Sequence, residues 1–146
     1  MSKSRFNFFA AVYLIAKEEN KVLLIRRFNT GWMDGMYTLP AGHIDGNETA
    51  QTAMFREAKE EVNLSILAND LHVVHTMHRK AENGREYFDI FLEAKSFSGE
   101  IKNNEENKCD EIGWFSLDSL PENTLDYVKE VFNQISKREH YSSFGF

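Results

Sequence analysis

The stretch GHIDGNETAQTAMFREAKEEVNL, residues 42–64, decides the fold and the chemistry of this chain. It opens with a glycine turn and continues as a helix with three closely spaced carboxylates, Glu57, Glu60 and Glu61. Their spacing of i, i+3 and i+4 places them on one helical face. Like charges this close repel one another unless a cation lies among them, and clustered carboxylate oxygens suit Mg²⁺ or Mn²⁺. The pattern therefore indicates metal-assisted attack on a phosphate substrate.

The apolar residues of the same helix support this interpretation. At about 100° per residue they form one arc that should face the body of the protein. Glu57 and Glu61 project into that arc, and Glu60 lies at its edge. A solvated face, the usual meaning of a glutamate-rich helix, would keep its glutamates away from the apolar side. Buried carboxylates require a partner, so a bound metal is favoured over the solvated face.

Residues 42–64 resemble the signature of the Nudix hydrolases, and in particular the branch that cleaves nucleoside triphosphates. The signature is a glycine, five residues, a glutamate, seven residues, Arg-Glu, an aliphatic residue, one more, Glu-Glu, one more, a glycine and an aliphatic residue. Every charged position of it is present among these 23 of 146 residues. Ala58 is a small substitute for the aliphatic residue, and Asn63 replaces the final glycine. Weaker likeness continues on both sides, in Arg26-Arg27, Leu39-Pro40-Ala41-Gly42 and Trp114-Phe115-Ser116-Leu117.

The resemblance implies roles for the matching residues. The metal ligands that it implies are Glu57, Glu60, Glu61 and the backbone carbonyl of Ala41. The catalytic residues that it implies are Glu57, Glu60 and Arg56, supported by Gly42 and Glu48. Glu60 is either a third ligand or the base that receives a proton from water. Arg56 cannot bind a cation, and it is interpreted as orienting the neighbouring carboxylates.

Arg26 and Arg27 end a predicted strand, so they point to opposite faces and only one of them can face a cleft. By resemblance that residue is Arg27, which would contact the substrate; an ordinary solvated arginine is the alternative. Trp32 and Tyr37 are candidates for a surface on which a base stacks. The alternative for both is membership of the core.

The loop before Trp114 offers further acidic residues. Relatives often supply an additional carboxylate from this region as a metal ligand or general base. The candidates are Glu105, Glu106, Asp110 and Glu111. Their spacing does not distinguish among them, and solvated acids are the alternative for most of them.

The function that the resemblance implies is Mg²⁺-dependent hydrolysis of a nucleoside diphosphate linked to another moiety, with Mn²⁺ as the alternative metal. The preferred substrate is a nucleoside triphosphate, including oxidised and noncanonical ones, converted to a monophosphate and pyrophosphate. Nucleotide sugars and dinucleoside polyphosphates are the rival substrates. A non-catalytic regulatory module that binds nucleotides is the rival from another class. It is disfavoured because such domains commonly lose the carboxylates that this chain retains.

Length and charge restrict the partners. A chain of 146 residues fits a single domain, 1–146, and a net charge of −6 gives no basic footprint for duplex nucleic acid. No segment is apolar for long enough to span a membrane. Cys109 is the only cysteine, which excludes an internal disulfide and fits a reducing cytoplasm. Assembly as a homodimer is left open.

The hydrophobic pattern predicts an α/β (α+β) fold in which helices cover both faces of a mixed sheet. The Nudix resemblance implies the same α/β/α sandwich. The predicted strands are 6–16, 21–27, 37–39, 71–79, 87–95 and 112–115, with 6–16 paired to 22–25. Asn47 and Thr124 are the predicted N-caps of the two helices, the second of which reaches about residue 138. Asn63 should end the first helix in a left-handed conformation.

Overall fold

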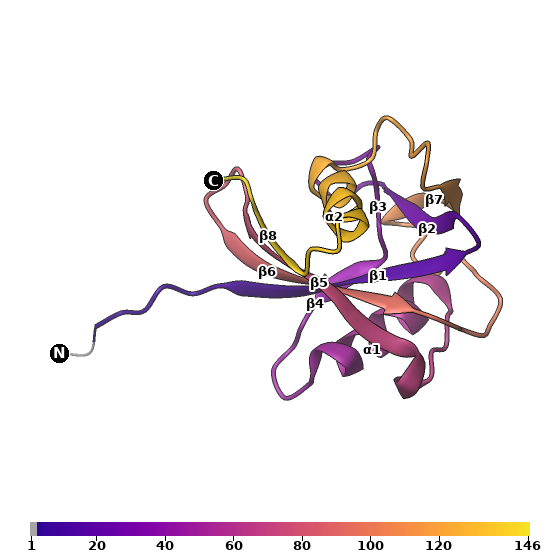
Figure 1. Ribbon diagram of the computed structural model, residues 1–146, viewed down its shortest axis with the longest axis horizontal. Coiled ribbons are helices and arrows are strands. Elements are labelled where there is room, and N and C mark those ends of the chain that lie inside the picture. Colours follow the sequence, from indigo (N-terminus) through magenta and orange to yellow (C-terminus); the bar gives the residue numbers. More distant parts are fainter. Residues whose placement is uncertain (1–2) are drawn as a thin grey trace.

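An eight-stranded mixed sheet organises residues 3–146, which are the residues that the computed structural model describes. Its main order is β3-β2-β1-β6-β5-β8, with β4 paired to β1 and β7 paired to β2. The strands are β1 (Phe9–Glu18), β2 (Lys21–Arg27), β3 (Tyr37–Thr38), β4 (Ala41–His43), β5 (Leu71–Lys80), β6 (Glu86–Ala94), β7 (Cys109–Ser116) and β8 (Tyr141–Phe144). The helices are α1 (Ala50–Val62), the 3₁₀ turn η1 (Ala68–Asp70) and α2 (Asp126–Ser136). Figure 1 shows α1 and α2 on opposite sides of the sheet, as the predicted sandwich requires.

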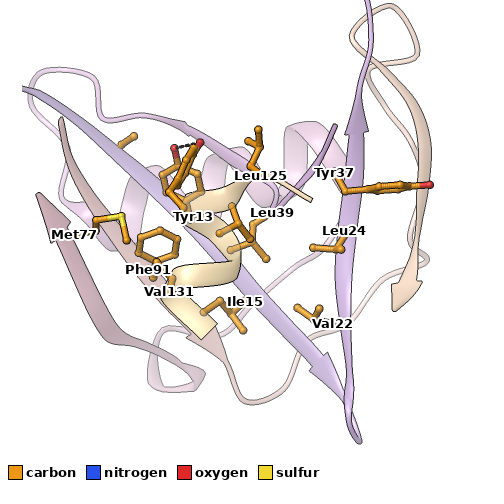
Figure 2. Close-up of a cluster of buried hydrophobic side chains, with 13 residues drawn as sticks. Tyr13, Ile15, Val22, Leu24, Tyr37, Leu39, Met77, Phe91, Leu125 and Val131 are labelled. Atoms are coloured by element: carbon orange, nitrogen blue, oxygen red, sulfur yellow. Dashed lines mark hydrogen bonds between the residues drawn. The ribbon is translucent and has the colours of Figure 1, made fainter. Parts of the chain in front are cut away.

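Strand β1 separates the two halves of the core because its side chains alternate between the faces of the sheet. One set packs with α2 and the other packs with α1, and both sets are buried. The α2 set is Ala11, Tyr13 and Ile15, and the α1 set is Val12, Leu14 and Ala16. Figure 2 shows Tyr13 and Ile15 beside Phe91 and Val131 in the cluster on the α2 side. No helix within residues 3–146 is long and apolar enough to cross a membrane.

The pairing of β1 differs from the prediction. It runs parallel to β6 from Phe9 to Ala16, and this pairing fixes Phe9 rather than Phe6 as the start of the strand. Its other edge is shared: β4 occupies 11–13, and β2 pairs only at the hairpin end, through Lys17 and Glu18. Because β4 takes the middle of that edge, β2 continues by pairing with β7. The predicted antiparallel pair of β5 and β6 is confirmed.

Both predicted helix N-caps are wrong. Asn47 has a φ of 66° in the preceding turn, and the N-cap of α1 is Thr49, whose hydroxyl accepts from the N–H of Thr52 at 3.1 Å. Thr124 is fully buried and forms a β-bridge with Tyr37, so α2 starts one residue later without a side-chain cap. This helix also ends at Ser136, because Arg138 has a φ of 60° that a helix cannot continue through.

Two strands were not predicted. Strand β4 lies within the glycine turn and is too short to show a period of two. Strand β8 has four residues and pairs in parallel with β5, a distant partner that no local pattern identifies. The strands around 112–115 and 71–95 exist as predicted, with ends that differ by up to three residues.

Asn63 confirms the predicted left-handed end of α1. Its φ and ψ are 61° and 28°, and its N–H donates to the carbonyl of Lys59 at 3.2 Å, while the N–H of Leu64 donates to the carbonyl of Ala58 at 3.1 Å. The amide of its side chain adds a hydrogen bond to the carbonyl of Glu100 at 2.8 Å. The residue therefore ends the helix and also ties it to the loop that leads to β7.

Replacement of Asn63 by valine should destabilise the fold by about 1–3 kcal/mol, because a β-branched residue resists positive φ. Asn63→Gly is the matched control and should change stability by no more than about 1 kcal/mol, since glycine accepts this conformation freely. Urea unfolding of the three proteins measures both values. Equal stability of the valine and glycine variants would contradict the left-handed cap.

Candidate active site

Strand β4 brings Gly42 directly against the first carboxylate of α1. A Cβ atom added at Gly42 would lie 2.1 Å from both Cδ and Oε1 of Glu57. Real Cβ atoms do not approach another atom so closely, and the obstruction is the carboxylate itself rather than empty space. A glycine is therefore required here so that Glu57 can rest on the backbone of β4.

Glu61 lies one turn further along α1 and is half-buried, whereas Glu60 beside it is exposed. Its Oε2 accepts a hydrogen bond from the backbone N–H of Ala41 at 3.1 Å. Burial raises the pKa of Glu61 well above its usual value, and the nearby charges of Glu57 and Glu105 raise it further. Burial also raises the pKa of Glu57, although Arg56 opposes that shift. Both carboxylates are therefore costly to ionise until a cation compensates them.

Arg56 links the carboxylates around the start of α1. Its Nη2 donates to Oε1 of Glu48 at 2.7 Å, and its Nη1 donates to Oε1 of Glu57 at 2.8 Å. Nη1 also lies 3.6 Å from Glu60, and Nη2 lies 3.3 Å from Asp45. Glu48 in turn accepts from the N–H of Asp45 at 2.7 Å. Because Nη2 also donates to the carbonyl of His43 in β4 at 3.3 Å, the guanidinium holds Glu57 and β4 together.

The carboxylates of α1 supply oxygen atoms to the wall of the cavity. Glu60 is 54% exposed, whereas Glu57 is only 13% exposed, and both line the same cavity as Ala41 and Glu61. Within residues 3–146, no three His, Cys, Asp or Glu side chains lie close enough together to hold a metal ion as they stand. The chemistry of the α1 carboxylates, a set of mutually repelling groups, still fits a hard divalent cation.

Of the four acids in the loop before Trp114, the structure places only Glu105 in this cavity. Its charge raises the pKa of both Glu57 and Glu61. Asp110 and Glu111 instead form ion pairs with Arg26 at 2.7 Å and 3.0 Å. Glu106 is exposed outside the cavity. The sequence could not make this distinction, because it depends on how the loop folds back over the end of α1.

The two consecutive arginines of β2 face different surroundings. Arg27 lines the cavity, and its guanidinium lies over the ring of Trp32 at 4.8 Å from the centroid. Its Nε donates to the carbonyl of Trp32 at 2.7 Å, and Trp32 lines the cavity as well. Arg26 is held outside the cavity by its two ion pairs. Tyr37 is buried against Phe115 and does not line the cavity, so its stacking role is corrected to a place in the core.

The far wall of the cavity consists of residues that the sequence interpretation missed. Arg79 of β5 forms an ion pair with Asp89 of β6, and the aromatic rings of Tyr87 and Tyr127 flank its guanidinium. The signal was an arginine and an aspartate at diagonal positions of a predicted strand pair. Their burial, which gives the pair its significance, depends on α2 packing over the sheet. The whole cavity has a volume of about 860 Å³, within the range of small-molecule sites.

Comparisons with known proteins agree with this geometry. The family model of the NUDIX domain matches residues 7–134. An ADP-ribose pyrophosphatase of Methanocaldococcus jannaschii is 32% identical over 121 residues, which are 83% of this chain and 69% of that protein. The crystal structure of a MutT NUDIX hydrolase from Burkholderia pseudomallei superposes with a TM-score of 0.81 at 24% identity, covering 88% of this chain and 98% of that one. A MutT protein of Methanosarcina mazei gives 0.78 at 19% identity, over 92% and 97% of the two chains.

A mixed sheet between two helices, with a glycine strand that lies against Glu57 of the first helix, places the chain among the α/β/α sandwich proteins. The match over residues 7–134 then settles the family, and the chain belongs to the Nudix hydrolases. It is accordingly an enzyme, a pyrophosphohydrolase.

Proposed function

We propose that the protein hydrolyses a nucleoside triphosphate, including oxidised or noncanonical ones, to a monophosphate and pyrophosphate in a Mg²⁺-dependent reaction. The observation that carries this proposal is that Glu57, Glu61 and Glu105 line the same cavity, close enough for the charges of Glu57 and Glu105 to raise the pKa of Glu61, and that this cavity is large enough for a nucleotide. Mn²⁺ is the alternative metal, because it accepts the same oxygen ligands.

Glu57, Glu60 and Glu61, with the carbonyl of Ala41, would hold the metal. When bound, the metal polarises phosphoryl oxygens and lowers the pKa of a water molecule. Glu60 is proposed as a third ligand or as the base, and its exposure leaves it free to reach a water. In the second case its carboxylate receives the proton of the attacking water, whose oxygen bonds to phosphorus as the bridging P–O bond breaks and pyrophosphate leaves.

Glu105 is proposed as the additional carboxylate from the loop. It reaches the same end of the cavity as Glu57 and Glu61, so it can serve as a further ligand or as the base. Arg56 positions Glu57 rather than the substrate, because its donors are occupied by Glu48 and Glu57.

A panel of nucleoside triphosphates, nucleotide sugars and dinucleoside polyphosphates, assayed with Mg²⁺ and with Mn²⁺, tests the proposal. Mass spectrometry should identify a nucleoside monophosphate and pyrophosphate as products, and excess EDTA should abolish turnover. Release of orthophosphate alone, or turnover that survives EDTA, would contradict it.

Hydrolysis of ADP-ribose is the second candidate, because the M. jannaschii relative is named an ADP-ribose pyrophosphatase. The two candidates differ in their products. ADP-ribose would yield AMP and ribose 5-phosphate, whereas a triphosphate yields pyrophosphate. A higher kcat/KM for ADP-ribose than for every triphosphate of the panel would replace the first candidate with the second.

Substrate contact by Arg27 gives a further prediction. Arg27→Ala should lower kcat/KM by about tenfold or more, the range of a charge-assisted hydrogen bond to phosphate. Arg26→Ala is the matched control and should change kcat/KM by less than about threefold, because Arg26 is paired with Asp110 and Glu111 outside the cavity. Steady-state kinetics on the best substrate measures both. If both variants changed kcat/KM equally and only slightly, Arg27 would be an ordinary surface residue that does not contact the substrate.

A further inference from the structure

Arg79 is an unusual component of a nucleotide cavity because it is almost completely buried. Its exposed fraction is 5%, yet it lines the same cavity as the carboxylates of α1. The rings of Tyr87 and Tyr127 flank the guanidinium, each with its centroid 4.3 Å from Cζ. Aromatic rings therefore cover the guanidinium, and a ligand can reach it only along its edge.

One edge of the guanidinium is already occupied. Nε donates to Oδ2 of Asp89 at 2.6 Å, and Nη2 lies 3.4 Å from Oδ1. Asp89 is fully buried and balances the charge of Arg79, so the pair is a weak anchor for a phosphate anion. Within residues 3–146, Nη1 donates to no atom in a hydrogen bond. The outer edge of the guanidinium, formed by Nη1 and Nη2, thus remains free to donate two parallel hydrogen bonds, one from each nitrogen. We call this pair of donors the fork.

The surroundings fix the orientation of this fork. The hydroxyl groups of Tyr127 and Tyr13 are 3.0 Å apart in a hydrogen bond, which ties the ring over Arg79 to the central strand. Tyr13 in turn stacks on Phe91 with centroids 4.7 Å apart. A donor fork held this rigidly can discriminate between bases, because a misplaced partner cannot be accommodated by rotation.

We propose that Arg79 selects the nucleobase of the substrate by donating from its outer edge to two adjacent acceptor atoms. This inference rests on the proposed hydrolysis of a nucleotide in the same cavity. Guanine offers such a pair in O6 and N7, the commonest specific partner of arginine, and cytosine offers N3 and O2. Adenine places its 6-amino donor beside N7, and thymine separates its two carbonyls by an N–H. The site is therefore a guanine or cytosine site and disfavours adenine.

The test compares kcat/KM for dGTP, dCTP, dATP and dTTP in the wild type and in Arg79→Lys. The wild type should prefer dGTP or dCTP over dATP by at least about tenfold, the discrimination expected of one bidentate contact. Lysine keeps a cation beside Asp89 but has no fork, so the preference should fall to less than about threefold. The loss should affect the favoured base and leave dATP nearly unchanged.

Arg26→Lys is the matched control, because Arg26 also pairs with an aspartate and lies over a tyrosine ring, but outside the cavity. It should leave the ratio of the four substrates unchanged. Thermal melting of each variant shows whether it is folded. Should Arg79→Lys not fold, the wild-type ratio decides alone: a preference for dATP, or equal rates for all four bases, overturns the inference.

Calorimetric titration of dGMP, dCMP and dAMP separates this inference from the proposed function, because binding of a monophosphate needs no turnover. Preferential binding of dGMP or dCMP that Arg79→Lys abolishes, without hydrolysis of any triphosphate, would support the base site and refute the hydrolysis. Hydrolysis with equal kcat/KM for all bases would support the hydrolysis and refute the base site. Equal binding of all three monophosphates, or equal losses for all substrates in Arg79→Lys, would return Arg79 to a structural role.

Discussion

Glu61→Gln is expected to lower kcat by at least ~10²-fold, a loss of roughly 3 kcal/mol of transition-state stabilisation. Glu57→Gln should have an effect of the same size. Both carboxylates lie at the end of the cavity where the metal would bind, and an uncharged amide is a poor ligand for Mg²⁺. Stopped assays that quantify pyrophosphate release, at saturating Mg²⁺ and substrate, measure the loss.

The fold of the Glu61→Gln protein should remain intact without metal. Burial, followed by the charges of Glu57 and Glu105, raises the pKa of Glu61 in the folded state. A raised carboxyl pKa gives stability that is present at low pH and is lost as pH rises through the folded value. Glutamine resembles the protonated form, and its amide oxygen can still accept from Ala41. At pH 7 the metal-free variant should therefore melt at the same temperature as the wild type or higher.

These two measurements separate a catalytic role from a structural one. Full activity of Glu57→Gln and Glu61→Gln would remove both from the site. A large fall in melting temperature together with the loss of kcat would show that the carboxylates matter for folding instead. Added Mg²⁺ should stabilise the wild type but not Glu61→Gln, because only a ligand that binds the folded state raises its stability.

The sequence predicted those parts of the molecule that depend on local pattern. The spacing of Glu57, Glu60 and Glu61 along a helix is a local property, and so is the left-handed conformation of Asn63. The alternation in β1 and the apolar face of α1 likewise follow from neighbours in the chain. These features could be inferred because the physics that determines them acts within one or two turns.

The remaining features depend on contacts between distant segments. Thr124 has the chemistry of an N-cap, but its bridge to Tyr37 removes it from the helix. The position of Glu105 depends on the path of a loop, and the burial of Arg79 and Asp89 depends on the packing of α2. No local sequence period predicts such contacts, so the wall of the cavity that contains Arg79 could be identified only from the structure.

Gly42→Ala is expected to lower kcat by about 10²-fold with little change in KM. The added methyl group would lie 2.1 Å from the carboxylate of Glu57, so that side chain must move by an ångström or more. A displacement of that size in a positioning group can cost 10²-fold. The backbone of Gly42 pairs with Val12 in β1 and can keep doing so, because alanine is tolerated in a short strand. Circular dichroism should therefore report an unchanged fold.

Gly46→Ala is the matched control for this prediction. Gly46 belongs to the same turn, but a Cβ atom there meets nothing within 4 Å. Its activity should stay within about twofold of the wild type, because no carboxylate has to move. If Gly42→Ala retained full kcat, Glu57 would not need its seat on β4. If both alanine variants lost activity equally, the cause would be the flexibility of the turn rather than the contact between Gly42 and Glu57. A loss of activity in Gly42→Ala but not in Gly46→Ala would support the proposed site. In that site Glu57 holds its position because Gly42 has no side chain.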